Sequence, residues 1–73
     1  YYEEEWADEI VNQTKAIDYK KDYYSKVSIA AIAHGAKYVR ITNKTLNGCT
    51  LEVRDDATGS LTTGTVDIKI KGY

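Results

Sequence analysis

Apolar and polar residues alternate along two segments near the C-terminal end, and this pattern constrains the fold more than any other feature of the sequence. Within 49–54 and 65–71, every second residue is apolar. Successive side chains of a strand point to opposite faces, so a period of two predicts strands with one buried and one solvated face. Turn-forming residues at 56–59 separate the segments, which predicts that the two strands pair in an antiparallel hairpin. The residues predicted to face inward are Cys49, Leu51, Val53, Val66, Ile68 and Ile70.

Two further strands are predicted upstream of this pair. Residues 27–31 form one, and Tyr38–Thr42 form another with Val39 and Ile41 on the same face. Asn47-Gly48 predicts a tight turn that connects the second of these strands to the next in a hairpin, because both residues tolerate positive φ. The second half of the chain is therefore predicted to form an antiparallel sheet with one face in water.

Length and composition restrict the chain to one small domain. A chain of 73 residues buries only about 60% of the surface that it exposes when unfolded, and its single cysteine excludes an internal disulfide. We therefore expect a metal ion or oligomerisation to add stability. Ten basic and eleven acidic residues leave a net charge of −1 without a basic run, so nucleic acid is not an expected partner. The longest uncharged stretches, ten residues each at 27–36 and 57–66, are far shorter than the roughly 20 that span a bilayer, so no membrane segment is expected.

Residues 3–22 fit two interpretations. Trp6, Ile10, Ile17 and Tyr24 recur at spacings of four and seven, which indicates an amphipathic helix. Acidic residues come first and lysines follow, as the helix dipole prefers. Under this interpretation the fold is α+β, with an N-terminal helix packed on an antiparallel meander. The alternative is a strand followed by a loop.

The C-terminal pattern also resembles part of the family 6 carbohydrate-binding modules. The best match consists of Leu51-Glu52-Val53-Arg54, the Thr58-Gly59 turn and the strand opening Gly64-Thr65-Val66. Weaker matches are Glu3-Glu4-Glu5, Gln13-Thr14, Asp22-Tyr23 and Gly35-Ala36-Lys37. These modules are β-jelly rolls, so the resemblance implies strand and loop for residues 3–22. We therefore predict an all-β antiparallel β-sandwich, a partial jelly roll, with residues 1–73 as a single domain or part of one.

The resemblance implies non-catalytic binding of a polysaccharide by a secreted or cell-surface module, with calcium as a structural cofactor. Tyr19 is the nearest match to the family's sugar-stacking tyrosine, and Asp22 and Tyr23 accompany it. Glu3 and Glu5 match acidic residues that help to hold calcium. From the residues alone, the tyrosines suit half-buried sheet positions and the glutamates a solvated acidic segment. Two carboxylates do not complete a calcium site, which takes roughly six to eight oxygens.

The chain departs from these modules in its length. It ends before the loop and the asparagine that complete the family's binding cleft, so it is a truncated or divergent relative, or another chain completes the sheet. Half a jelly roll exposes strand edges that invite pairing. The alternative function is therefore a structural subunit of an extracellular assembly or fibre, a homo-oligomer formed through strand pairing between chains.

No enzymatic activity is expected. His34 precedes Gly35 in a predicted loop, so we interpret it as an ordinary surface histidine. Cys49 is predicted to face inward with its apolar neighbours, so we interpret it as a core thiol. Asp55-Asp56 is assigned to turn geometry. The glycosylation acceptor triplets at Asn12 and Asn43 agree with an extracellular location.

Overall fold

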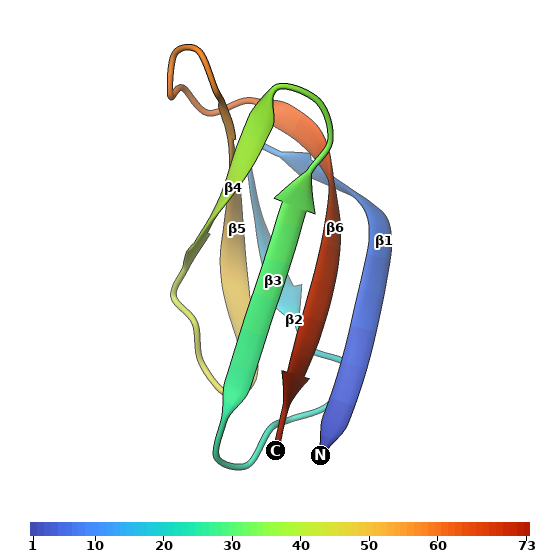
Figure 1. Cartoon of the computed structure of the whole chain (residues 1–73). Coiled ribbons are helices and arrows are strands. Elements are labelled where there is room, and N and C mark those ends of the chain that lie inside the picture. The colour runs from blue at the N-terminus through green and yellow to red at the C-terminus, as the bar shows by residue number, and fades with distance from the viewer.

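The computed structural model describes residues 1–73 and contains strands but no helix (Figure 1). The strands are β1 (Tyr2–Asn12), β2 (Thr14–Asp18), β3 (Val27–Ala33), β4 (Lys37–Thr42), β5 (Gly48–Asp55) and β6 (Thr63–Gly72). The all-β prediction is confirmed, and the alternative with an N-terminal helix is wrong. No helix long and apolar enough to cross a bilayer is present.

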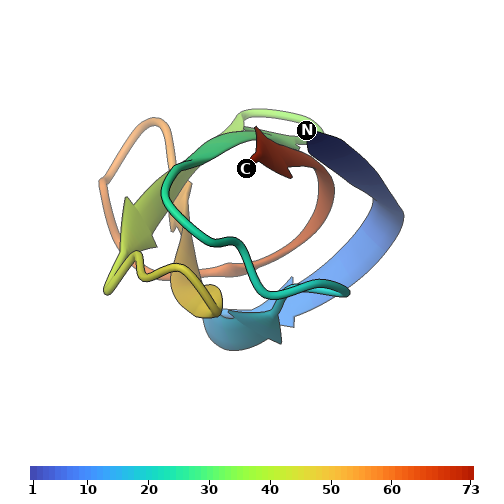
Figure 2. The same cartoon turned by 90° about the horizontal axis from the view of Figure 1, so that it is seen from below.

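The strands form two antiparallel three-stranded sheets, in the orders β1-β6-β3 and β2-β5-β4. The first strand pairs with the last and the second with the fifth, which is the winding of a jelly roll reduced to six strands. Seen from the end where the termini lie, the strands surround a common interior (Figure 2). The chain passes from one sheet to the other at Gln13, whose φ of 70° makes the sharp bend between β1 and β2.

The core lies between the sheets and is built by the predicted alternation. All six residues predicted to face inward are buried, including Cys49, which is confirmed as a core thiol. β5 and β6 are the central strands of their sheets, so their apolar faces are covered by each other and by the neighbouring strands. The ten buried residues of this core are Val11, Ile17, Tyr19, Tyr23, Cys49, Leu51, Val53, Val66, Ile68 and Ile70.

The sequence pattern predicted that the strands labelled β5 and β6 pair in a hairpin, and this prediction is wrong. These strands lie in different sheets, and the only pairing nearby is an isolated bridge between Arg54, near the end of β5, and Leu61, which precedes β6. The turn itself is present: the Asp55 side chain accepts hydrogen bonds from the N–H groups of Ala57 and Thr58, and Gly59 has a φ of 74°. Alternation identifies the buried face of a strand but not its hydrogen-bonded neighbour, so it did not reveal that the chain changes sheets here.

The predicted hairpin of β4 and β5 is confirmed, although its turn differs in detail. The positive φ of 50° occurs at Asn43, and neither Asn47 nor Gly48 adopts one. The Thr45 hydroxyl oxygen instead accepts hydrogen bonds from the N–H groups of Asn47 and Gly48. A side chain thus supplies the turn that the Asn-Gly pair was expected to make.

A β-bulge explains why the N-terminal sequence mimics a helix. The register of the pairing between β1 and β6 shifts between Trp6 and Glu9. Asp8, within this interval, has a φ of 54°. One inserted residue changes which side chains face inward, so Glu4 is buried before the bulge and Val11 after it. Ile10, which the helical spacing grouped with Trp6, is 68% exposed.

Replacing Leu51 tests the shared core. Leu51→Ala removes a fully buried side chain from a central strand, and we expect it to lower the free energy of unfolding by about 2–5 kcal/mol. Leu61→Ala is the matched control because Leu61 is 38% exposed, and we expect a loss within about 1 kcal/mol. Urea denaturation measures both. Equal losses would show that the two sheets do not share a packed core at Leu51.

Candidate functional site

Two of the predicted sugar-binding residues belong to the core. Tyr19 and Tyr23 are only 7% and 4% exposed, and their rings meet edge to face with centroids 5.5 Å apart. The Tyr19 hydroxyl donates a hydrogen bond to the Thr45 carbonyl oxygen at 3.0 Å, and burial raises the pKa of Tyr19 to about 12. Asp22 is exposed in the loop beside them. The structure therefore does not present either ring as a stacking platform for a sugar.

The predicted calcium ligands share the outer face of β1 but already have protein partners. Glu3 accepts a hydrogen bond from the Tyr1 hydroxyl at 2.6 Å, and Glu5 forms an ion pair with Lys69 at 3.5 Å. No cluster of three or more His, Cys, Asp and Glu ligands includes either of them. Calcium requires roughly six to eight oxygens, so these two carboxylates by themselves do not fit the ion. Glu4, which lies between them, points inward and accepts hydrogen bonds from the Lys20 N–H group at 2.9 and 3.1 Å.

Asp8, His34 and Asp67 form a polar cluster on the outer face of the β1-β6-β3 sheet. One Asp67 oxygen accepts the Asp8 N–H at 2.9 Å, and the other lies 2.8 Å from His34 Nε2. Potential metal-ligating atoms of the three residues lie within 4.8 Å of one another, but all three residues are exposed and the two hydrogen bonds account for their proximity. The hydrogen bond with Asp67 raises the pKa of His34, and the N–H of Asp8 together with His34 lowers the pKa of Asp67.

The His34 pKa provides a direct test of this cluster. We expect imidazole proton chemical shifts to give a pKa above the ordinary 6.5, and Asp67→Asn to return it toward 6.5. Because the folded-state pKa is raised, the stabilisation from protonated His34 is complete below pH 6.5 and disappears as the pH rises through that pKa. The Asp67 pKa is lowered, so its contribution is present above pH 3.8 and is lost as the pH falls through the folded-state value. An unchanged pKa in Asp67→Asn would contradict the pairing.

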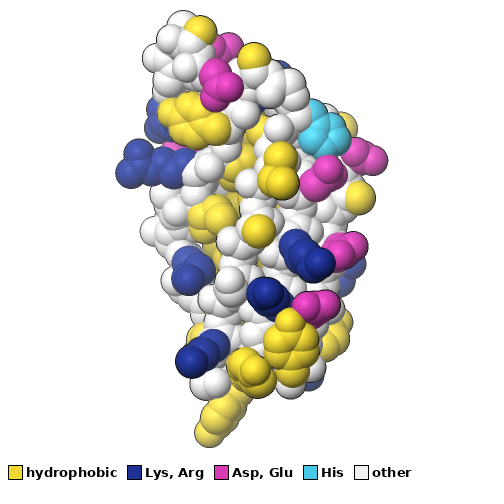
Figure 3. Space-filling view, viewed as in Figure 1, with side chains coloured by type: hydrophobic (Ala, Val, Ile, Leu, Met, Phe, Trp, Pro, Cys, Tyr) yellow, Lys and Arg dark blue, Asp and Glu magenta, His cyan; other side chains and the backbone are white.

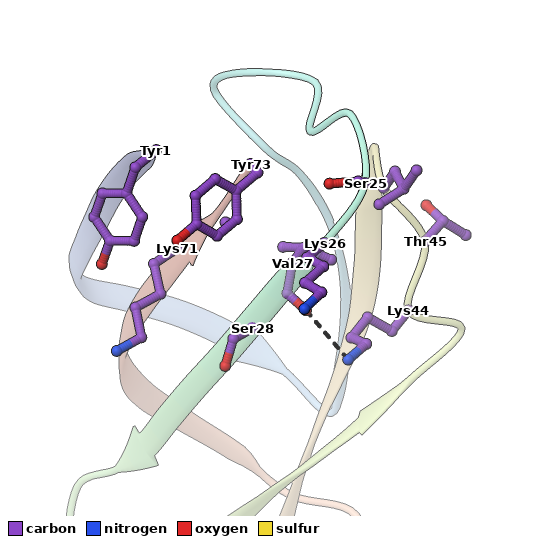
Figure 4. A pocket seen from close by; sticks show the side chains of 11 residues that line it. Tyr1, Ser25, Lys26, Val27, Ser28, Lys44, Thr45, Lys71 and Tyr73 are labelled. Carbon is purple, nitrogen blue, oxygen red and sulfur yellow. Dashed lines mark hydrogen bonds between the residues drawn. The ribbon is translucent and has the colours of Figure 1, made fainter.

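The most distinctive surface feature is a groove of about 530 Å³ beside the chain termini. Eleven residues line it, and they come from the chain start before β1, the end of β6, the start of β3 with the loop before it, and the β4–β5 loop. We call it the tyrosine–lysine groove after five of them, Tyr1, Lys26, Lys44, Lys71 and Tyr73. Figure 4 shows the two tyrosine rings side by side near Lys71, with Lys44 reaching in from the opposite wall. In the space-filling view, hydrophobic and basic side chains meet at this end of the molecule (Figure 3).

Backbone hydrogen bonds fix the wall that carries Tyr73. The Tyr73 N–H donates to the Lys26 carbonyl oxygen at 3.0 Å, and the Tyr73 carbonyl accepts the N–H groups of Tyr24 and Ser25. Gly72 permits this approach, since any Cβ at this position would collide with the Lys26 carbonyl group. The loop that follows β2 is thereby fastened to the end of β6.

The two groove tyrosines differ from the buried pair in their exposure. Tyr1 and Tyr73 are 71% and 58% exposed, and their rings meet edge to face with centroids 5.5 Å apart. The hydrogen bond to Glu3 raises the pKa of Tyr1, so its hydroxyl stays protonated in the neutral range. Each tyrosine therefore offers the groove an exposed aromatic surface together with a hydroxyl group.

A second groove of about 520 Å³ lies on the outer face of the β1-β6-β3 sheet, next to the polar cluster. Its lining includes Trp6, Ile32 and Lys69 as well as Asp8 and Asp67, so charges of both signs border it. The Trp6 Nε1 atom is buried without a hydrogen-bond partner, and the Lys20 amine lies 5.3 Å from the centroid of the ring. The Trp6 side chain thus already contacts Lys20 and packs against the core.

No family model, curated protein or solved structure matches the chain. The candidate site therefore depends on its own geometry. Sequence reasoning missed Tyr1, Tyr73 and the three groove lysines because they come from segments far apart in the chain. The one available signal was the composition, with seven tyrosines and no phenylalanine, which suits half-wet surfaces.

Phenylalanine substitution tests the structural role of Tyr19. Tyr19→Phe keeps the buried ring but leaves the Thr45 carbonyl without its donor, and we expect a loss of about 0.5–1.5 kcal/mol in the free energy of unfolding. Tyr24→Phe is the control, since Tyr24 is 91% exposed, and we expect almost no change. Chemical denaturation compares the two variants. A neutral Tyr19→Phe would remove the structural explanation for its hydroxyl.

Proposed function

We propose that the protein binds a polysaccharide, without catalysis, in the tyrosine–lysine groove. The observation that carries this proposal is the pair of exposed rings, Tyr1 and Tyr73, at the rim of a groove of about 530 Å³. An aromatic ring packs on the apolar face of a pyranose, while nearby polar groups hydrogen-bond its hydroxyls. The resemblance to family 6 modules indicates the same ligand class. The residues that match the family's binding residues, Tyr19, Asp22 and Tyr23, do not line this groove.

The lining of the groove supplies the polar partners that a sugar needs. Ser25, Ser28 and Thr45 contribute hydroxyl groups, and the three lysines contribute amines. The volume falls within the range of roughly 300–1,000 Å³ that is usual for small-molecule pockets, which suits a short segment of a sugar chain. These groups would bind a sugar through hydrogen bonds and packing, and the side chains that line the groove include no carboxylate, imidazole or thiol.

Two other observations bear on this proposal. Both acceptor asparagines, Asn12 and Asn43, are exposed, which agrees with the extracellular location that we propose for a polysaccharide-binding protein. Strand pairing between copies is the rival function, but the edge strand β1 combines a bulge with a run of carboxylates, and both features oppose pairing. At the β1 edge, these features favour the proposed polysaccharide binding over assembly.

Alanine substitution of the groove tyrosines tests the proposal. We expect the chain to be retarded in native gels that contain a polysaccharide, and Tyr1→Ala or Tyr73→Ala to weaken binding about three- to tenfold, corresponding to about 0.5–1.5 kcal/mol for one aromatic contact. Tyr38→Ala is the matched control, because Tyr38 is 41% exposed on β4 and does not line the groove.

A panel of xylan, cellulose derivatives, β-glucan, pectin and dextran sulfate covers neutral and charged sugar chains. Free migration in every gel would contradict the proposed function. Equal weakening in all three variants would place binding outside the groove.

A further inference from the structure

We infer that the tyrosine–lysine groove selects acidic polysaccharides, whose sugars carry carboxylate or sulfate groups, over neutral ones. This inference rests on the proposed function and adds the charge of the ligand. Its basis is a local excess of positive charge in a chain whose net charge is −1. Lys26, Lys44 and Lys71 line the groove, and no Asp or Glu lines it with them.

The three groove lysines form no ion pair within the protein. The ion pairs of the molecule are Lys15–Glu9, His34–Asp67, Arg54–Glu52 and Lys69–Glu5, and none involves a groove lysine. Lys44 makes one long hydrogen bond, 3.4 Å to the Val27 carbonyl oxygen, shown as the dashed line in Figure 4. A lysine ammonium has three donors, so most of the donor capacity in the groove remains for a ligand.

The carboxylate of Glu3, which lies close to the groove, does not cancel the excess of positive charge. Glu3 faces Lys71 across the β1–β6 ladder, yet it accepts the Tyr1 hydroxyl and forms no ion pair with Lys71. On the other side of β6, Lys71 faces Ser28, which is neutral and also lines the groove. One glutamate at the rim therefore offsets part of the charge of three lysines.

The shape of the groove favours a sugar chain over other polyanions. The rings of Tyr1 and Tyr73 are inclined at 68°, so they do not form parallel platforms for successive bases. The lysines gather at one end of the molecule and do not form the basic stripe that follows a nucleic-acid backbone. An acidic sugar combines an apolar ring face for the tyrosines with an anionic group for the lysines.

The decisive comparison uses polygalacturonate and its fully methyl-esterified form, which share a backbone and differ in charge. We expect the acidic form to bind about tenfold more tightly at low ionic strength, and the difference to shrink in high salt as the amines are screened. Isothermal titration calorimetry on the full chain measures both affinities. Dextran sulfate and dextran provide a second matched pair, with sulfate as the anion.

Charge substitutions locate the effect. We expect Lys26→Gln, Lys44→Gln and Lys71→Gln each to weaken binding of the acidic form about two- to fivefold and to leave the ester unchanged. Arg40→Gln is the control, since Arg40 is exposed on β4 outside the groove. Glu3→Gln retains an acceptor for the Tyr1 hydroxyl and removes the rim carboxylate, so we expect it to tighten binding of the acidic form. Far-UV circular dichroism checks that each variant is folded.

The outcomes separate the inference from the proposed function. Equal affinity for the acidic and esterified forms, or for dextran sulfate and dextran, would overturn charge selection and leave polysaccharide binding standing. Binding to no member of either pair would overturn the proposed function as well. Single-stranded DNA that binds as tightly as polygalacturonate would overturn the assignment to sugars, because the groove would then be a general polyanion site.

Discussion

Mutual burial of the two inner sheet faces is the constraint on which the rest of this structure depends. β5 and β6 each occupy the centre of a sheet, and their apolar residues form most of the core. With no disulfide available to a chain of 73 residues, this single layer of packed side chains takes the place of a covalent staple. Every surface feature, including the tyrosine–lysine groove, is positioned by strands that pack on this layer.

The sequence predicted the buried faces well because parity is a local property. Leu51, Val53 and Ile68 face inward as their alternation requires. Strand partners were harder to predict, since the segment after β5 resembles a hairpin turn but carries the chain into the other sheet. The helical spacing from Trp6 to Ile10 was misleading because the bulge at Asp8 changes the parity within one strand. Such a bulge adds one residue without any distinctive motif.

For the candidate site, the sequence resemblance suggested only a ligand class, a polysaccharide, which remains a proposal. It did not identify the residues that line the groove. Tyr19 and Tyr23 fit a sugar-binding role by resemblance, but they belong to the loop that follows β2, and their buried rings are part of the core. The residues that line the groove meet through pairing of β1, β6 and β3, which brings positions 1, 28 and 71 together. A linear motif contains no information about such a meeting, whereas the register of three paired strands specifies it.

The position of the groove also connects the proposed ligand binding to the order of folding. The rings of Tyr1 and Tyr73 meet at its rim, and a hydrogen bond from Tyr73 to Lys26 fixes the wall that carries Tyr73. Both contacts join residues far apart along the chain, and contacts of this kind cost more loop-closure entropy than local ones and form slowly. A partly folded chain with only the β4–β5 hairpin in place has no groove. The proposed ligand binding would therefore require the completed fold, because the groove exists only when both ends of the chain are in place.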